Sequence, residues 1–398
     1  MHSEQQPENT DVIVRRGTDC EKWDGMAQVF GRDDLLPMWV ADMDLPAPPQ
    51  VVDALKNRAE HQVYGYTFRP DSYYQAFIDW NRQRHHWQIS PECLSDAPGV
   101  IPAMALCIHT YTAPGDQILI QTPVYRPFFD VVTDNKRKLV TSPLVEDQGY
   151  YQMDYDDIAQ KFAQGVRMMI LCNPHNPVGR VWTADELKRL GELCLAYDVK
   201  IITDEIWADL VYPPHRYQPM AAINRDLANQ TIALLAPSKT FNIAGLHNSI
   251  AVIHNKDWKK QYDQALKRAH LDFANIFSVV AFTAAYRFGG EWLDQLLGHL
   301  KSNCHQVTAA LDGYGGIRIR PPEGTYLLWL DFRSLGLGQD LIIKALVEHG
   351  KLGLSDGRSF GREGDGYMRM NVGCPRSMVT EGIARIKESI AYLTEKAE

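Results

Sequence analysis

Short apolar segments alternate with longer amphipathic segments through the middle of the chain. Five of the short segments are at most seven residues long and apolar at nearly every position, which is typical of strands covered on both faces of a sheet. They span residues 116–121, 166–172, 199–205, 231–236 and 249–254. Two of them are separated by about 30 residues with room for a helix, so we predict a mostly parallel, doubly wound α/β sheet.

The clearest helix of this region is predicted over residues 183–197. Thr183 and Glu186 have the spacing of a capping box, in which each side chain bonds the backbone N–H of the other residue. Apolar residues then recur at helical spacing and predict the buried face of the helix. That face consists of Leu187, Leu190, Leu193 and Cys194.

The last hundred residues have a different pattern, which predicts a smaller α+β domain. It contains a helix near 291–312, a strand in TYLLWLDF, a helix at 339–350, a strand in GYMRMNVG and a helix from residue 376. We therefore divide the chain into three parts. These are an N-terminal arm with part of the small domain (1–45), a large domain (46–288) and the small C-terminal α+β domain (289–398).

The composition is that of a globular protein and excludes several classes of function. Of the 398 residues, 45% are apolar and 23% charged, close to the globular average. Lys and Arg number 41 against 49 Asp and Glu, a net charge of −8, which argues against a nucleic-acid or anionic-membrane partner. No apolar run approaches the ~20 residues that cross a bilayer, and residues 1–11 lack the apolar core of a signal peptide.

Seven cysteines are scattered singly along the chain, and none belongs to a CxxC pair. An odd number without such spacing favours reduced thiols over a disulfide framework or a zinc site, so we expect a cytoplasmic protein without a metal. The phosphate loop GxxxxGK[ST] and the dinucleotide fingerprint GxGxxG after a strand are both absent. The sequence therefore lacks the usual motifs of a nucleotide-binding protein.

Three of the five predicted strands are followed directly by polar segments, CNPHNPVGR, TDEIW and PSKTFNIAGL. Ligands of open parallel sheets bind outside the carboxyl ends of the strands, so we expect Asn176, Asp204 and Lys239 to converge on one crevice. Pyridoxal phosphate requires an amine for a Schiff base, an anion at its ring nitrogen and a donor near its phenolic oxygen. These three side chains would supply those groups.

The ordered set NPxNPxG, [ST]DEI and SKxFN resembles fold-type I pyridoxal-phosphate enzymes of the aminotransferase class I/II superfamily. The segments WDGMAQVFGRDDLLPMWVADMDLPAP, APSKTFNIAGL and GYMRMNVGCPRS narrow the resemblance to the MalY/PatB branch. Members of that branch are cystathionine β-lyases, also called cysteine-S-conjugate β-lyases or C–S lyases. The similarity extends from about residue 20 to about residue 390, and it implies that the large domain binds pyridoxal 5′-phosphate.

The resemblance assigns a role to each residue at the centre of the expected site. Lys239 forms the Schiff base and acts as acid and base at Cα, while Asp204 bonds the ring nitrogen. Asn176 donates to the phenolic oxygen, with Asn173 as the alternative. Arg369, in the last predicted strand, binds the substrate α-carboxylate, because arginine offers a rigid fork of two donors for a planar anion.

Further residues are expected around the cofactor. Tyr125 stacks on the ring, and the phosphate lies where PGVIPAM opens a helix, because helix N-termini favour anions. The phosphate donors are the amides of Gly99, Val100 and Ile101 and the hydroxyl of Ser238. Tyr66, or Tyr64 in its place, resembles the tyrosine that reaches the phosphate and substrate of a neighbouring subunit. The resemblance thus implies a homodimer.

Three positions depart from the wider superfamily. Trp207 stands where aminotransferases often carry a tyrosine that bonds the phenolic oxygen, and Ala236 replaces a common phosphate-binding serine. His247 replaces an arginine that binds the phosphate in many relatives. Backbone amides and tyrosine are therefore expected to hold more of the phosphate.

The resemblance implies α,β-elimination from an amino-acid substrate that carries a sulfur leaving group. L-Cystathionine would give pyruvate, ammonia and homocysteine, and cysteine S-conjugates would react similarly. An aminotransferase would use the same side chains and differ only in the fate of the carbanion, since fold alone does not fix the reaction. A pyridoxal-phosphate protein with an added regulatory role is a further alternative.

Overall fold

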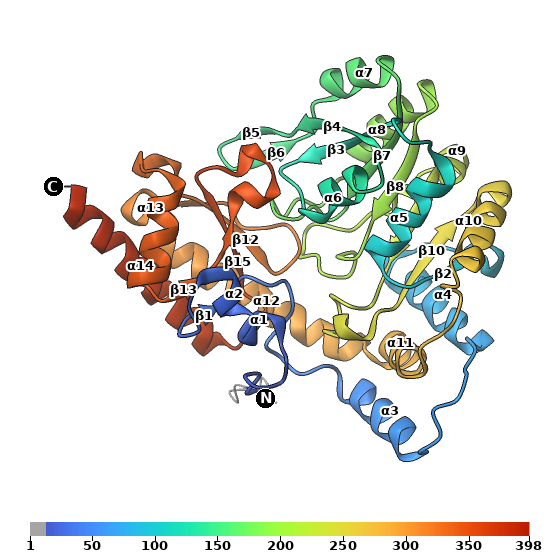
Figure 1. Cartoon of the computed structure of the whole chain (residues 1–398), viewed down its shortest axis with the longest axis horizontal. Coiled ribbons are helices and arrows are strands. Elements are labelled where there is room, and N and C mark those ends of the chain that lie inside the picture. Colours follow the sequence, from blue (N-terminus) through green and yellow to red (C-terminus); the bar gives the residue numbers. More distant parts are fainter. Residues whose placement is uncertain (1–12, 398) are drawn as a thin grey trace, which may run out of the picture.

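The computed structural model describes residues 13–397, with side chains described up to residue 393. The polar segment 1–11 lies outside the described residues, and so does the beginning of the predicted arm 1–45. Figure 1 shows a large α/β unit, coloured mainly cyan to yellow, beside a smaller unit in orange and red. Most of the N-terminal residues, in blue, lie below and between the two.

The large unit contains a seven-stranded sheet with the strand order β2-β10-β9-β8-β7-β3-β4. Its strands are β2 (Leu94–Ala97), β3 (Gln117–Thr122), β4 (Lys138–Pro143), β7 (Val166–Cys172), β8 (Lys200–Asp204), β9 (Thr231–Leu235) and β10 (Ser249–Ile253). Five neighbouring strands are parallel, whereas β10 is antiparallel to both of its neighbours. The predicted mostly parallel α/β sheet is confirmed, and all five predicted strands belong to it. The edge strands β2 and β4 were not predicted, because they are shorter or less apolar.

The sheet is covered on both faces, as the unbroken apolar strands predict. Ile118 and Ile120 of β3 point into one hydrophobic core, and Leu119 points into the other. This alternation follows from the two-residue period of a strand. The first face is covered by α5 (Val100–Tyr111), α6 (Pro127–Thr133) and α10 (Lys256–Arg268), and the second by α7 (Tyr155–Ala163), α8 (Ala184–Ala196) and α9 (Arg225–Gln230).

The helix predicted over 183–197 is α8, and its capping box is present. Thr183 Oγ1 accepts a hydrogen bond from the Glu186 amide at 3.2 Å, and Glu186 Oε2 accepts one from the Thr183 amide at 2.8 Å. Three of the four residues predicted for the buried face are fully buried. Leu193 is only partly buried against the same core.

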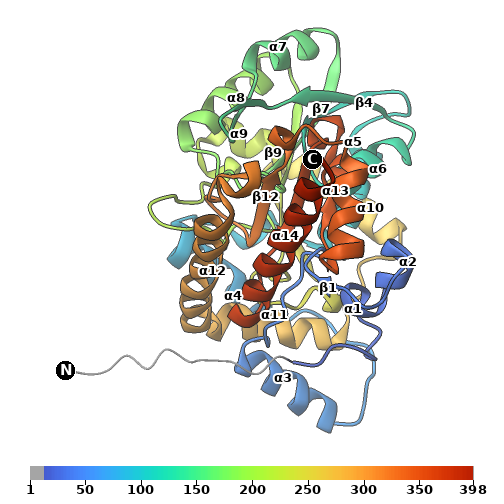
Figure 2. The same ribbon diagram turned by 90° about the vertical axis from the view of Figure 1, so that its left-hand side faces the viewer.

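The small unit contains an antiparallel four-stranded sheet with the order β11-β12-β15-β14. Its strands are β11 (Arg318–Ile319), β12 (Leu327–Asp331), β14 (Ser355–Asp356) and β15 (Tyr367–Asn371). The three predicted helices are α12 (Gly290–Leu311), α13 (Gln339–Lys344) and α14 (Arg376–Ala397). α13 is shorter than predicted because its continuation, Ala345–His349, is π-helical. Figure 2 shows α14 running along the small unit.

The N-terminal residues join the small unit through a short parallel pairing. After α1 (Glu21–Asp24) and α2 (Met26–Phe30), β1 (Leu36–Pro37) pairs with β13 (Leu352–Gly353). The chain then enters α3 (Pro49–Glu60), α4 (Asp71–His85) and, much later, α11 (Ile276–Phe288), which packs against both. A small hairpin is formed by β5 (Val145–Asp147) and β6 (Tyr150–Gln152). The predicted domain boundaries stay a prediction.

No helix within residues 13–397 is both long enough and apolar enough to span a membrane. All seven cysteines lie in this range, and each is a free thiol.

Candidate active site

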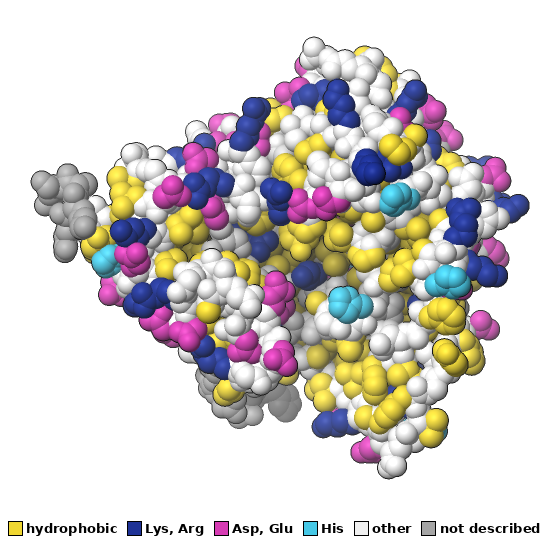
Figure 3. Space-filling view, viewed as in Figure 1, with side chains coloured by type: hydrophobic (Ala, Val, Ile, Leu, Met, Phe, Trp, Pro, Cys, Tyr) yellow, Lys and Arg dark blue, Asp and Glu magenta, His cyan; other side chains and the backbone are white. Residues whose placement is uncertain are grey.

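A cavity of about 260 Å³ lies at the carboxyl ends of β7, β8 and β9. It is bordered by the N-terminus of α5 and by Ala41 of the N-terminal segment. Figure 3 shows the surface hollowed between the large and small units. The predicted site residues that line the cavity are Gly99, Val100, Ile101, Tyr125, Asn176, Asp204, Ser238 and Lys239.

Lys239 follows β9, and its amine is held by a backbone carbonyl from a distant part of the chain. Lys239 Nζ donates to the carbonyl oxygen of Ala41 at 2.6 Å. Burial lowers the pKa of Lys239 to about 8, although the negative charge of Asp42 opposes that shift. A lysine with this pKa is available in its neutral, nucleophilic form near pH 8.

Asp204 is the last residue of β8, beside Cys172 of β7. Its Oδ1 accepts a hydrogen bond from the Ile206 amide at 3.1 Å. Burial raises the pKa of Asp204 to about 6, and that hydrogen bond and Lys239 only partly oppose the shift. A cationic ring nitrogen beside this carboxyl would favour its ionised form.

Arg369 lies on β15 in the small unit, and it is not among the residues that line the cavity. Its Nη1 donates to Asn176 Oδ1 at 3.1 Å, so the Asn176 Nδ2 group remains available to donate to a ligand. Its Nη2 donates to the Trp39 carbonyl at 2.8 Å and to Ser355 Oγ at 3.2 Å. Burial lowers the pKa of Arg369 to about 10, which leaves the guanidinium charged at neutral pH. Its Nε is buried without a hydrogen-bond partner among the described residues.

The structure separates the two asparagines that the sequence left as alternatives. Asn176 lines the cavity, whereas Asn173 does not. Asn173 Nδ2 donates to the Gln218 carbonyl at 3.0 Å, and its Oδ1 accepts from the Trp182 amide at 3.4 Å. Asn173 therefore stabilises the loop after β7.

Tyr125 and Tyr66 lie in different surroundings. Tyr125 lines the cavity, and burial raises the pKa of its hydroxyl. The side chain of Tyr66 is fully exposed and does not line the cavity of its own chain, and its ring lies 6.3 Å from that of Phe273. The hydroxyl of the alternative residue, Tyr64, donates to the Ala59 carbonyl at 2.7 Å.

Comparison with known proteins identifies the family. The sequence profile of aminotransferase class I and II matches residues 34–386. The chain belongs to this family.

Among class I and II relatives, cystathionine beta-lyase PatB of Bacillus subtilis is 39% identical over 379 residues, which is 95% of this chain and 98% of PatB. Protein MalY of Escherichia coli is 33% identical, over 95% of this chain and 97% of MalY. The solved structure of a PLP-bound C-S lyase from Staphylococcus hominis has a TM-score of 0.90 and 31% identity, and the match covers 96% of this chain and 97% of that one. The resemblance to the MalY/PatB branch is confirmed.

The side chains at this site suit pyridoxal phosphate, which is bound in the Staphylococcus hominis structure. An amine, a carboxylate and an amide donor face one cavity, and the amide groups that begin a 12-residue helix lie at its edge. A helix N-terminus favours a phosphate group. At Gly99 an added Cβ would lie 3.3 Å from the Pro102 ring, so the absence of a side chain leaves this turn open to a ligand.

The three departures from the wider superfamily all lie at the cavity wall. Trp207, Ala236 and His247 line it, and Trp207 is buried with its ring 4.9 Å from that of Tyr326. Tyr326 and the residues around Ala41 are site neighbours to which the sequence assigned no role. Ala41 interacts through its backbone carbonyl, which accepts from Lys239 and from the Tyr326 hydroxyl. Because every residue type has a backbone carbonyl, the sequence gives no sign of such a contact.

Proposed function

We propose that this protein is a pyridoxal-phosphate-dependent carbon–sulfur β-lyase. It cleaves L-cystathionine and cysteine S-conjugates to pyruvate, ammonia and a thiol such as homocysteine. The observation that carries this proposal is the 39% identity to the cystathionine beta-lyase PatB over 95% of the chain. A cavity lined by Lys239, Asp204 and Asn176 supports it.

Residues on several sides of the cavity would hold pyridoxal phosphate. Lys239 would bond its aldehyde carbon, Asp204 its ring nitrogen and Asn176 its phenolic oxygen, and Tyr125 would stack on the ring. The amides of Val100 and Ile101, at the start of α5, and the Ser238 hydroxyl would bind the phosphate.

The reaction would use two basic residues of the chain in different ways. Arg369 would bind the substrate α-carboxylate and so orient the Cα–H bond. The amine of Lys239, set free when the substrate amine replaces it at the aldehyde carbon, would then take the Cα proton. Asp204 keeps the ring nitrogen protonated, since a carboxylate beside it favours the cation. The bound cofactor supplies an electron sink for the charge left at Cα. The Cβ–S bond would then break, and the thiolate would leave with the proton that Lys239 took from Cα. Lys239 would return to the aldehyde carbon and so release aminoacrylate, which water hydrolyses to pyruvate and ammonia.

An aminotransferase is the second candidate, because the matching family includes that activity in its name. L-Cystathionine supplied alone distinguishes the two. A β-lyase releases pyruvate, ammonia and homocysteine in equal amounts over many turnovers. An aminotransferase stops after one equivalent and resumes only when a 2-oxo acid is added.

Two lysine variants test the assignment of the amine. Lys239→Ala abolishes release of pyruvate, while Lys267→Ala, on the exposed face of α10, leaves it unchanged. Borohydride fixes the cofactor to the peptide that contains Lys239. A label on another lysine, or undiminished turnover in Lys239→Ala, contradicts the proposal.

We also propose that the protein is a homodimer and that Tyr66 serves the phosphate and substrate of the partner's site. Five exposed apolar residues, which we call the apolar patch, support this proposal: Val63, Tyr64, Tyr66, Phe68 and Phe273. Apolar side chains gather at the lower right of the surface in Figure 3, near α3. An exposed apolar cluster of this kind is typical of an interface.

A cytoplasmic location completes the proposal. It is supported by the seven free thiols, because secreted proteins usually pair their cysteines.

A further inference from the structure

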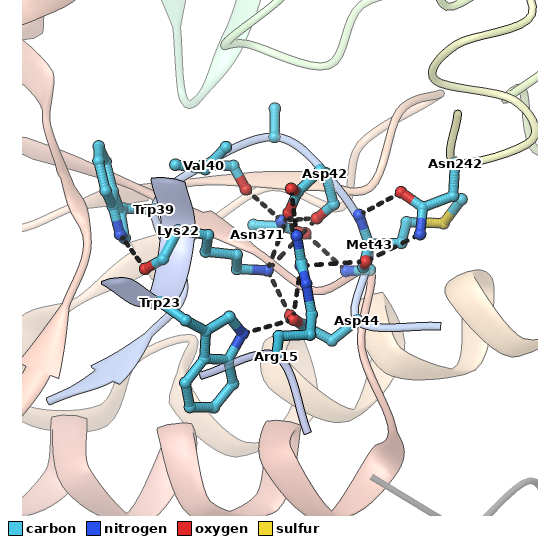
Figure 4. Close-up of polar contacts among 12 residues, drawn as sticks. Arg15, Lys22, Trp23, Trp39, Val40, Asp42, Met43, Asp44, Asn242 and Asn371 are labelled. Atoms are coloured by element: carbon cyan, nitrogen blue, oxygen red, sulfur yellow. Dashed lines mark hydrogen bonds and ion pairs between the residues drawn. The ribbon is translucent and has the colours of Figure 1, made fainter. Parts of the chain in front are cut away.

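Residues 39–45, which we call the strap, connect β1 to α3 and pass between the two units beside the cavity. Figure 4 shows polar side chains from both units, from α1 and from Arg15 converging on this short segment. Almost every carbonyl of the strap accepts a hydrogen bond from a side chain. These carbonyls belong to Trp39, Val40, Ala41, Asp42, Met43 and Leu45.

Two asparagines tie the strap to the two units. Asn371, two residues after Arg369 on β15, donates to the carbonyls of Val40 and Asp42, both at 2.6 Å. Asn242, three residues after Lys239, exchanges hydrogen bonds with the backbone of Met43 at 3.0 and 2.9 Å. A shift of the strap would therefore disturb the segments that carry both proposed site cations.

The strap also contacts these cations directly. Its Trp39 carbonyl accepts from Arg369 Nη2 at 2.8 Å, and its Ala41 carbonyl accepts from Lys239 Nζ at 2.6 Å. The guanidinium is otherwise held through Nη1 by Asn176 and through Nη2 by Ser355. The position of Trp39 thus helps to determine how Arg369 is oriented.

Lys22 of α1 holds the strap at three points. Its ammonium forms a buried ion pair with Asp44 and donates to the Asp42 carbonyl at 3.3 Å, and its own carbonyl accepts from Trp39 Nε1 at 3.0 Å. Both side chains of the ion pair are 1% exposed. Arg15 binds the same two aspartates from the other side, at 2.6 Å to Asp42 and 2.8 Å to Asp44.

We propose that Lys22 is a positioning residue, which fixes the strap so that Arg369 is oriented for the substrate carboxylate. This inference rests on the roles assigned to Arg369 and Lys239 in the proposed function. Buried ion pairs contribute little net stability relative to apolar replacements. Its contacts with Trp39, Asp42 and Asp44 instead suit a role in fixing geometry.

The test compares Lys22→Met with Lys161→Met in the holoenzyme. Lys161 is a matched control, because it also donates to a carbonyl, that of Thr141 at 2.6 Å, and to a carboxylate, that of Asp157. It lies on α7, at the top of the large unit in Figure 1. In Lys22→Met the Asp44 carboxylate keeps its ion pair with Arg15 and its hydrogen bond from Trp23 Nε1, so we expect that variant to fold.

Two measurements are made on each variant. We expect Lys22→Met to raise KM for L-cystathionine about tenfold with a smaller change in kcat, since a misplaced Arg369 weakens binding before it alters the chemistry. Hydrogen–deuterium exchange of the Met43 and Asp44 amides, which are bonded to Asn242 and to the Gly373 carbonyl, should become faster. Lys22→Arg should restore both properties in part, and Lys161→Met should change neither.

An unchanged KM in a folded Lys22→Met, or an equal increase in Lys161→Met, overturns the inference. If Lys22→Met does not fold, Trp39→Phe decides, because it removes only the indole bond to Lys22 and keeps a ring against Phe30. A wild-type KM in Trp39→Phe then refutes the inference. Failure of the proposed function is separate, since the unaltered protein would then release no pyruvate. If the unaltered protein releases no pyruvate, amide exchange still tests whether Lys22 fixes the strap. Unchanged exchange of the Met43 and Asp44 amides in Lys22→Met or Trp39→Phe would show that it does not.

Discussion

Burial, more than charge pairing, sets the ionisation of the side chains at the centre of the site. It raises the pKa of Asp204 to about 6 and lowers those of Lys239 and Arg369 to about 8 and about 10. Arg369 therefore keeps its charge at neutral pH, whereas the charge on Lys239 is lost as the pH rises through 8. Arg369, proposed to bind a carboxylate, thus keeps its charge, and Lys239, proposed to accept a proton, can lose its charge near pH 8.

Burial also shifts the pKa of His175, which lies between Asn173 and Asn176 in the loop after β7. This shift makes the stability of the protein depend on pH. The buried Nε2 of His175 lies 2.8 Å from the Pro123 carbonyl, and burial lowers the pKa of the ring from 6.5 to about 4. Between these pH values the unfolded chain binds more protons than the folded protein. The free energy of unfolding therefore falls as the pH drops from 6.5 to 4, by up to about 3 kcal/mol.

We expect this part of the pH dependence to disappear in His175→Gln, whose amide can still donate to the Pro123 carbonyl. Urea unfolding at several pH values between 4 and 7 measures it. His305→Gln, at an exposed position, serves as the control and should follow the unaltered protein. The explanation is wrong if His175→Gln loses as much stability on acidification as the unaltered protein does.

At the scale of single elements, α8 shows how local sequence specifies a helix. Its start, its capping box and most of its buried face follow from residues within a few positions of one another. The end of β15 is different, because Asn371 bonds carbonyls more than 300 residues away in the chain. Periodicity predicts the strand but says nothing of these contacts.

Removing the cap of α8 should destabilise the protein without affecting its activity. Thr183→Ala leaves the Glu186 amide without its side-chain acceptor, which costs about 1 kcal/mol. A lower urea midpoint with unchanged kcat and KM is the expected result. Thr380→Ala, inside α14 on an exposed face, should lose less, because alanine favours a helix interior. Equal losses in the two variants would show that the cap contributes nothing.

At the scale of the whole molecule, the apolar patch combines four residues between α3 and α4 with Phe273, which lies shortly before α11. Tyr66 and Phe68 are 101% and 77% exposed, and Tyr66 is absent from the cavity of its own chain. Both observations are explained if this surface is buried against a second copy, where Tyr66 reaches the partner's site.

Subunit mixing tests this arrangement. Lys239→Ala and Tyr66→Phe homodimers are each expected to be impaired, whereas a hybrid dimer has one site with both residues intact. Mixing under conditions that allow subunit exchange should therefore restore activity. Lys239→Ala mixed with Lys239→Arg provides the control, since every site still lacks the lysine. A fully active protein that sediments as a monomer would contradict the proposal.

The sequence by itself determined what depends on neighbouring residues. Unbroken apolar runs predicted the central strands, and the spacing of Thr183 and Glu186 predicted the cap, because burial on two faces and helix capping both leave periodic or local patterns. The ordered polar segments after three strands predicted which side chains would share a cavity, although their chemical roles stay predictions. The tertiary structure decided the rest. It placed β10 antiparallel, added the polar edge strands and distinguished Asn176 from Asn173. It also brought the Trp39 carbonyl to Arg369, 330 residues away, through backbone atoms that every residue type shares.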